Sequence, residues 1–319
     1  MTLFSSVTCA VILAVGCRPT PRVNSPPPAV PPAPAAAIDS IDAGGTAIRF
    51  LQQGRGVAVL FIHGAISDHR YWDAQREAIA RQYRFIALDR RYFGPAPWPD
   101  TTVRMSDVTD AADAARLIRH LDLGPAFVVG VSGGANVALR LAVEHPGVVR
   151  GLFIHEPTLA SIVTDTTVWM AARAPAAQGG GPAAAARAGR IAEAAKLFVE
   201  RVNAGRIQFE QLPPAVQAMF VENARTLTLE TATDTPLTCD HLRRLQIPVT
   251  ISRGEWANPR PTAIASAAQR CIPYSELLVV KEAGHSAPRE NPAAFNEPLL
   301  DFLARHQGRA RLPTSPITN

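Results

Sequence analysis

Short runs of continuously apolar residues recur along this chain and alternate with segments of helical periodicity. Three examples are "GVAVLFIHG" (56–64), "YRFIALDRR" (83–91) and "AFVVGV" (126–131). A strand that is apolar at successive positions is buried on both faces, which is typical of a parallel sheet covered by helices. The alternation therefore predicts an α/β domain with a mostly parallel sheet, right-handed crossovers and flanking helices.

The same patterns place the remaining elements and mark one interruption. We expect further strands at 46–54, 149–155, 247–254 and 275–285, and helices at 68–82, 106–121, 134–145, 261–270 and 292–305. Ser106 or Asp107 is a candidate N-cap of the second of these helices. The alternation pauses over 158–235, which is Ala-rich and helical in pattern. We therefore expect a core of residues 38–157 and 236–306 with a helical cap insertion at 158–235, and such insertions usually cover a binding crevice.

The charge of the chain is mild and its distribution excludes some classes of partner. The 319 residues carry a formal net charge of +5, and 47% of them are apolar. Basic residues are scattered, with no basic helix interleaved with aromatic residues, so a nucleic-acid partner is not expected. Neither a CxxC pair nor a His-rich cluster suggests a zinc site, and no metal is expected.

The N-terminal segment has the character of an export signal. Residues 3–17, "LFSSVTCAVILAVGC", are uncharged and apolar but short for a membrane span. They end in a sequence that resembles a bacterial lipoprotein box, with Cys17 as the lipidated residue. Residues 18–37 are rich in Pro and Ala and read as a semi-rigid linker. We expect a signal and lipobox segment at 1–17 and an exported protein, either membrane-anchored or periplasmic/extracellular, the alternative being a cytoplasmic protein with an apolar extension.

Export would have a consequence for the cysteines. Cys239 and Cys271 are the two cysteines of the globular part, and an oxidising compartment allows them to pair. Two buried free thiols are the alternative. At the other end of the chain, residues 307–319 are expected to be a disordered tail.

A group of small residues separates one predicted strand from the helix that follows it. Gly130, Ser132 and Gly134 fit the pattern G-x-S-x-G in the strand–turn–helix context that this motif requires. So sharp a turn strains the backbone at its apex, and a Cβ at the glycines would collide with the neighbouring strand or helix. The serine then stands exposed at a helix N-terminus, where a developing anion is favoured. Ser132 is therefore a candidate nucleophile, and an ordinary Gly-rich turn is the alternative.

Two histidines complete a recognisable pattern. His63-Gly64 follows an early buried strand, and His285 follows the last predicted strand in "AGHSAPRENP". With the Ser132 turn, this order resembles the serine-nucleophile branch of the α/β-hydrolase superfamily over about residues 45–306. The segment "LDRRYFGPA" is similar to the D-x-R-G-x-G segment of that family, with Tyr92 where Gly is common.

The resemblance implies a role for each matching residue. His285 is the general base for Ser132, and His63 is a structural residue of the turn. The backbone N–H groups of Ala65 and Gly133 form the oxyanion hole. Neither a metal nor an organic cofactor is implied.

The acid of the triad is ambiguous. In most of the superfamily it lies three residues after a Gly that ends the strand following the insertion, but here that position is Ala257 and the next residue is Asn258. Glu255 lies beside that Gly, where the family often carries an additional acidic residue. The other known position is the end of the preceding strand, which is occupied by Glu156 in "GLFIHEPTLA". We assign the acid to Glu156, with Glu255 as the alternative.

The predicted function is a serine hydrolase that cleaves an ester-like bond of a small acyl substrate through an acyl-enzyme. The alternative is a non-catalytic relative that binds a small ligand in the same pocket. Esterase, lipase, lactonase, peptidase and C–C hydrolase activities all remain open. Several large side chains of the insertion either face the pocket or pack within the insertion, namely Trp169, Phe198, Phe209, Met219 and Phe220.

Overall fold

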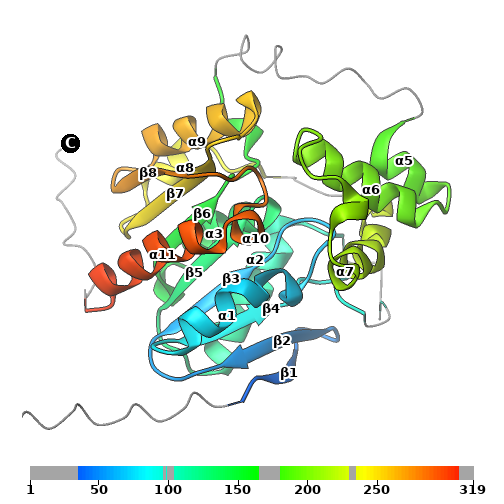
Figure 1. The fold of residues 1–319 in the computed structure, drawn as a ribbon. Coiled ribbons are helices and arrows are strands. Elements are labelled where there is room, and N and C mark those ends of the chain that lie inside the picture. The colour runs from blue at the N-terminus through cyan, green and yellow to red at the C-terminus, as the bar shows by residue number, and fades with distance from the viewer. Residues whose placement is uncertain (1–34, 96–97, 99–103, 165–179, 230–234, 309–319) are drawn as a thin grey trace, which may run out of the picture. The chain divides into compact units, whose positions relative to one another are not determined.

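The computed structural model describes residues 35–95, 98, 104–164, 180–229 and 235–308. Its centre is an eight-stranded sheet in the order β1-β2-β4-β3-β5-β6-β7-β8 (Figure 1). β1 pairs antiparallel with β2 and β2 with β4, whereas all other neighbours are parallel. The mostly parallel sheet expected from the sequence is therefore confirmed. The strands are β1 (Ala37–Asp42), β2 (Ala47–Gln53), β3 (Ala58–Ile62), β4 (Arg84–Leu88), β5 (Ala126–Val131), β6 (Val149–His155), β7 (Val249–Gly254) and β8 (Ser275–Val280).

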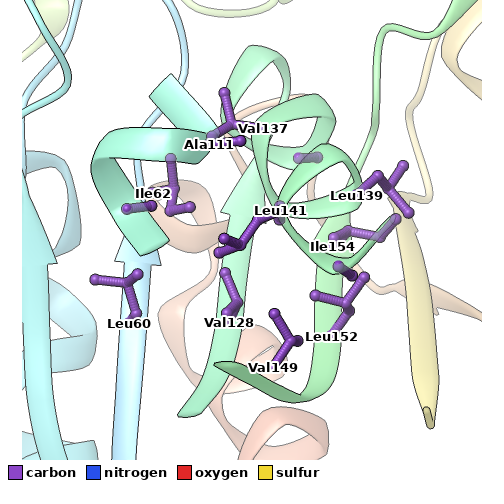
Figure 2. Packing of buried hydrophobic residues seen from close by; sticks show 14 of the residues in the cluster. Leu60, Ile62, Ala111, Val128, Val137, Leu139, Leu141, Val149, Leu152 and Ile154 are labelled. Atoms are coloured by element: carbon purple, nitrogen blue, oxygen red, sulfur yellow. The ribbon is translucent and has the colours of Figure 1, made fainter. Parts of the chain in front are cut away.

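Helices cover both faces of the sheet. One layer contains α2 (Asp107–His120), α3 (Gly133–Glu144), α8 (Cys239–Arg243) and α9 (Pro259–Cys271), and the other contains α1 (Asp73–Ala80), α10 (Ala287–Glu290) and α11 (Pro292–His306). Alternate residues of each central strand enter opposite layers: Leu60 and Ile62 pack on the α2–α3 side, whereas Phe61 packs on the α1–α11 side. Figure 2 shows the first of these layers, where Val137 and Leu141 of α3 lie over the strands.

The sequence patterns fail at two places in the N-terminal part. β1 was not expected, because most of its residues are exposed and it carries no apolar run. It forms a strand because it pairs with β2. The helix expected over 68–82 is divided into a 3₁₀ turn, η1 (His69–Trp72), and α1. Asp68 accepts a hydrogen bond from the Arg70 N–H and so begins the tighter turn. Ser106 is the cap of α2, since its side chain accepts from the Thr109 N–H.

The segment between β6 and β7 is helical where it is described. It contains η3 (Ala160–Ile162), α5 (Gly181–Arg187), α6 (Ile191–Val202), η4 (Phe209–Gln211), α7 (Pro214–Ala224) and η5 (Arg225–Thr228). Figure 1 shows α5, α6 and α7 as a group beside the sheet. Asn223 of α7 fastens this group to the core, because its Oδ1 accepts from the Gly94 N–H at 2.7 Å and its Nδ2 donates to Asp68 at 2.7 Å. Trp169 lies outside the described residues.

A disulfide joins Cys239, at the start of α8, to Cys271, at the end of α9. The two Cα atoms are 5.1 Å apart, and 32 residues separate the cysteines in sequence. The pairing left open by the sequence is therefore present in the structure. Cys17 and the other residues of the expected export segment lie outside the described part of the chain. Among the described residues, none of the helices has the length and apolar character needed to cross a bilayer.

Candidate active site

Ser132 occupies a strained turn between β5 and α3. Its φ and ψ are 55° and −122°, a region that residues with a side chain rarely adopt. The flanking glycines make this turn possible. A Cβ on Gly130 would lie 2.5 Å from the Gly134 carbonyl oxygen, and a Cβ on Gly134 would lie 2.2 Å from the Ile62 carbonyl oxygen. The sharpness of the turn therefore requires glycine at position 130, and its packing against the end of β3 requires glycine at position 134.

His285 and Glu156 meet at the carboxyl end of the sheet. His285 Nδ1 lies 2.7 Å from Glu156 Oε2, and the Gly254 N–H donates to Glu156 Oε1 at 2.9 Å. The register of β6 against β7 places Glu156 beside Gly254, since His155 pairs with Ser252 and the Glu156 N–H donates to the Ser252 carbonyl. His285 reaches the carboxylate from the segment between β8 and α10. With Nδ1 donating to the carboxylate, the Nε2 of His285 carries the lone pair that a general base needs.

Glu156 is held in its charged form. Burial alone would raise the pKa of this carboxyl, but the hydrogen bond from His285, the neighbouring imidazoles and the Gly254 N–H lower the pKa to about 2. Burial also lowers the pKa of His155 to about 4, so that ring is neutral near pH 7. The hydrogen bonds from His285 and Gly254 are therefore the interactions that keep Glu156 ionised at neutral pH.

Glu255, the alternative acid, faces another partner. Its Oε1 accepts from Lys281 Nζ at 2.8 Å, and its Oε2 accepts from the Glu282 N–H at 3.0 Å. The hydrogen bond from Lys281 is the main reason why the pKa of Glu255 is lowered. The structure thus brings Glu156 to His285 and leaves Glu255 in a surface ion pair.

The predicted oxyanion donors lie on either side of Ser132. Gly133 begins α3, and Ala65 follows the His63-Gly64 turn and lines the same pocket as Ser132 and His285. Neither the Ala65 N–H nor the Gly133 N–H finds an acceptor among the residues that the structure describes. Two free N–H groups beside a nucleophile are what the stabilisation of an oxyanion requires.

His63 supports this turn from behind. Its Nδ1 lies 2.8 Å from the Gly64 carbonyl oxygen, and its Nε2 accepts from the Arg90 N–H at 3.0 Å. Burial and the nearby Arg90 charge lower the pKa of His63 to about 3, so the ring is neutral at physiological pH. A neutral, buried ring with both nitrogens bonded to the backbone agrees with the structural role expected for His63.

A small pocket that opens to solvent lies beside Ser132. The core contributes Ala65, Tyr71 and Val131 among others, and the insertion contributes Phe198 and Phe220 as two of its lining residues. Phe209 and Met219 are buried elsewhere in the core of the insertion. Among the described residues that line the pocket, His285 and Tyr71 are the titratable groups, and burial raises the pKa of Tyr71. The described walls thus suit an uncharged, apolar group.

Sequence reasoning missed two polar features around this pocket. Asn203, at the end of α6, accepts from Ser286 Oγ at 3.1 Å and so links the insertion to the residue after His285. Arg90 lies buried behind the His63-Gly64 turn. Asn203 belongs to no motif, and the position of Ser286 beside His285 was its one signal. Arg90 lies in the "LDRRYFGPA" segment, but at a position that the family pattern leaves unspecified.

One cluster of potential metal ligands lies apart from the pocket. Asp68, His69 and Asp89 offer atoms within 4.8 Å of one another. Each is already engaged: Arg70 donates to both oxygens of Asp68, and His69 Nδ1 lies 2.7 Å from Asp89 Oδ1. A cation here would have to displace the Arg70 guanidinium, so these residues are better explained as a structural network.

Comparison with known protein families identifies the family of this chain. The profile of the alpha/beta hydrolase family matches residues 59–297, a range that includes the Ser132 turn, Glu156 and His285. The chain therefore belongs to the alpha/beta hydrolase family.

The individual relatives match this chain either over part of its length or at low sequence identity. A 2-(acetamidomethylene)succinate hydrolase of Mesorhizobium japonicum is 31% identical over 112 residues, which cover 35% of this chain and 40% of that protein. The matches span less than half the length of the curated relatives. The carboxylesterase CesB of Bacillus subtilis superposes with a TM-score of 0.68 at 19% identity, covering 85% of this chain and 92% of that one. Est816, described as an N-acyl homoserine lactone degrading enzyme, gives 0.65 at 23% identity, with coverages of 83% and 100%. These two likenesses show the fold.

Proposed function

We propose that this protein is a serine hydrolase that cleaves the acyl bond of an ester-like substrate, with Ser132 as nucleophile, His285 as general base and Glu156 as the acid. The observation that carries the proposal is the 2.7 Å contact between His285 and Glu156 beside the strained Ser132 turn, with Ser132 and His285 lining one pocket. The names of a carboxylesterase and a lactone-degrading enzyme among the structural neighbours agree with chemistry at an acyl–oxygen bond.

The first half of the reaction forms an acyl-enzyme. His285 Nε2 accepts the Ser132 hydroxyl proton as Oγ bonds to the substrate carbonyl carbon, and the carbonyl oxygen becomes an oxyanion. The Ala65 and Gly133 N–H groups donate to this oxygen. The Glu156 carboxylate stabilises the imidazolium that forms. When the carbon–oxygen bond breaks, the imidazolium returns its proton to the departing alkoxide.

The second half hydrolyses the acyl-enzyme. Water gives a proton to His285 while its oxygen attacks the acyl carbon, and the second tetrahedral intermediate uses the same two N–H donors. Its collapse releases the carboxylic acid and restores the Ser132 hydroxyl with the proton from His285. The apolar walls contributed by Val131, Phe198 and Phe220 favour an uncharged acyl group.

Covalent labelling tests the proposal. A fluorophosphonate reacts with an activated serine, so wild-type protein is expected to gain one adduct on Ser132, detected by peptide mass spectrometry. Ser132→Ala is expected to abolish the adduct and to lower the hydrolysis of p-nitrophenyl esters on the order of 10⁴-fold or more. A series of acyl chain lengths then defines the substrate range. An unlabelled wild-type protein would instead favour the non-catalytic, ligand-binding alternative.

We also infer export with lipidation at Cys17, from the uncharged apolar segment that ends in Gly16-Cys17 and the Pro-rich residues behind it. Intact-mass analysis of the membrane fraction is expected to show loss of residues 1–16 and added acyl chains. Cys17→Ser is expected to release the protein from that fraction. A full-length, unmodified product would contradict the inference.

A further inference from the structure

Two successive arginines follow β4, and each is buried against α2. Arg90 Nε donates to Asp110 Oδ2 at 2.7 Å, and Arg91 Nε donates to Asp113 Oδ2 at 3.0 Å. The arginines are 8% and 5% exposed. The two arginines are therefore similarly buried, and each one links the segment after β4 to an aspartate of α2.

Their remaining contacts differ. Arg91 continues away from the candidate site and donates to Thr46 Oγ1 and to the Ala43 carbonyl, between β1 and β2. Arg90 turns toward it. Its Nη1 lies 3.4 Å from the Gly64 carbonyl oxygen and 3.6 Å from the point where a Cβ on Gly133 would stand. The guanidinium of Arg90 thus lies next to Gly64, the residue before Ala65, and next to Gly133. The N–H groups of Ala65 and Gly133 are the predicted oxyanion donors.

The Gly64 carbonyl belongs to the same peptide group as the Ala65 N–H. This oxygen receives three donors, which are His63 Nδ1 at 2.8 Å, Ser67 Oγ at 3.4 Å and Arg90 Nη1 at 3.4 Å. Hydrogen bonds to the oxygen of an amide polarise the group and make its N–H a stronger donor. Asp110 binds Nε and Nη2 of Arg90, so Nη1 presents the positive end of this buried ion pair to Gly64. The effect of that dipole on a forming anion is strengthened where water is excluded.

We propose that Arg90 is a positioning residue of the oxyanion hole: held by Asp110, it orients and polarises the Gly64–Ala65 peptide so that the Ala65 N–H stabilises the tetrahedral intermediate. The inference rests on the proposed serine-hydrolase function and deepens it. Arg91, which points the other way, performs only a structural task.

The two arginines provide a matched experiment. Replacing each ion pair as a unit avoids leaving a buried aspartate without its partner, so the variants are Arg90→Met/Asp110→Leu and Arg91→Met/Asp113→Leu. Each is compared with the wild type in p-nitrophenyl butyrate hydrolysis and in inhibition by butylboronic acid, which forms a tetrahedral, anionic adduct with an active-site serine. Thermal melts and near-ultraviolet circular dichroism check the fold.

The Arg90 pair variant is expected to lose roughly tenfold to a hundredfold in kcat with little change in KM, less than the 10²–10³ typical of deleting a donor outright. Its affinity for the boronic acid is expected to fall by a similar factor. The Arg91 pair variant is expected to keep kcat and boronic acid affinity near the wild type. Equal kcat losses in the two variants, or a change in KM alone, would overturn the inference.

A single substitution covers the case in which the Arg90 pair variant does not fold. Arg90→Lys keeps a positive charge beside Asp110 but lacks the rigid fork that reaches Asp110 and Gly64 together. It is expected to lower kcat at unchanged KM, and an unchanged kcat overturns the inference. Fluorophosphonate labelling of the wild type separates the two proposals, because labelled wild type with no specific Arg90 effect leaves the serine-hydrolase function standing.

Discussion

Glu156 is a fully buried carboxylate in an unusual backbone conformation. Its φ is 44°, at the point where β6 ends. A residue with a side chain adopts this region only where the surroundings hold it there. Here the Glu156 N–H donates to Ser252, and each carboxylate oxygen has a donor, Gly254 on one side and His285 on the other. These contacts fix the carboxylate on Nδ1 of His285.

Replacing each of the two candidate carboxylates with an amide tests the assignment of Glu156 as the acid. Glu156→Gln is expected to lower kcat on the order of 10²–10⁴, because an amide neither fixes the His285 tautomer nor stabilises the imidazolium. Glu255→Gln, which disturbs only an exposed pair with Lys281, is the matched control and is expected to cost little. Steady-state kinetics on folded proteins gives the ranking, and the reverse order would transfer the acid role to Glu255.

The low pKa of Glu156 also predicts a pH dependence of stability. Because the folded-state pKa, about 2, lies below the ordinary glutamate value of 4.5, ionised Glu156 stabilises the fold above about pH 4.5, and this contribution is lost as the pH falls toward 2. Urea unfolding of wild type and Glu156→Gln between pH 7 and pH 2.5 measures it. The difference in unfolding free energy is expected to shrink across the acidic window. A constant difference would show that ionisation of Glu156 does not stabilise the fold.

At the scale of elements, α7 is tied to the core by one buried side chain. Asn223 Oδ1 satisfies the Gly94 N–H, while its Nδ2 donates to Asp68 and to the Met219 carbonyl. Nearby, Glu222 pairs with Arg70 at the surface. Because Phe220 of the same helix lines the pocket, the position of α7 also sets one wall of the candidate site.

Truncating this side chain is expected to loosen the insertion. Asn223→Ala leaves the buried Gly94 N–H without its acceptor and removes one of the donors to Asp68, which keeps those from Arg70. It is expected to destabilise the protein by about 1–3 kcal/mol. Gln217→Ala is a control on the same helix, since its side chain bonds only Glu210 and Leu212 within the insertion. Urea unfolding compares the two, and protease sensitivity of the insertion is expected to rise in Asn223→Ala alone. Equal effects would contradict the special role of Asn223.

At the scale of the whole molecule, the disulfide connects the helix before β7 to the helix after it. Cys239 begins α8, directly before β7, and Cys271 ends α9, directly before β8. The bridge therefore brackets the strand that carries Gly254, a partner of Glu156.

Removing the bridge is expected to cost stability more than activity. In the chain-entropy model, closing a loop of this size contributes about 3–4 kcal/mol. Cys239→Ser/Cys271→Ser is expected to melt at a lower temperature than oxidised wild type, with kcat near that of the wild type. Dithiothreitol is expected to lower the melting temperature of the wild type to that of the variant and to leave the variant unchanged. Identical melting of oxidised wild type and variant would show that the bridge does not stabilise the fold.

The sequence by itself determined the class of fold, the central strands and the Ser132 turn. The reason is that these features are local. A run such as 58–62 is apolar on both faces, and the glycines around Ser132 are needed because a Cβ there would clash with neighbouring backbone. The edge strand β1 escaped because it buries little and depends on pairing with β2.

Only the tertiary structure decided which distant groups meet. Glu156 and His285 are 129 residues apart, and they meet because the end of β6 and the segment after β8 reach the same edge of the sheet, whereas Glu255 pairs with Lys281. Arg90 and Arg91 both pair with α2, and only the tertiary structure shows that Arg90 also reaches Gly64 whereas Arg91 reaches Thr46 and Ala43. Composition and periodicity record which residues are buried, whereas strand register and helix packing decide which of them touch.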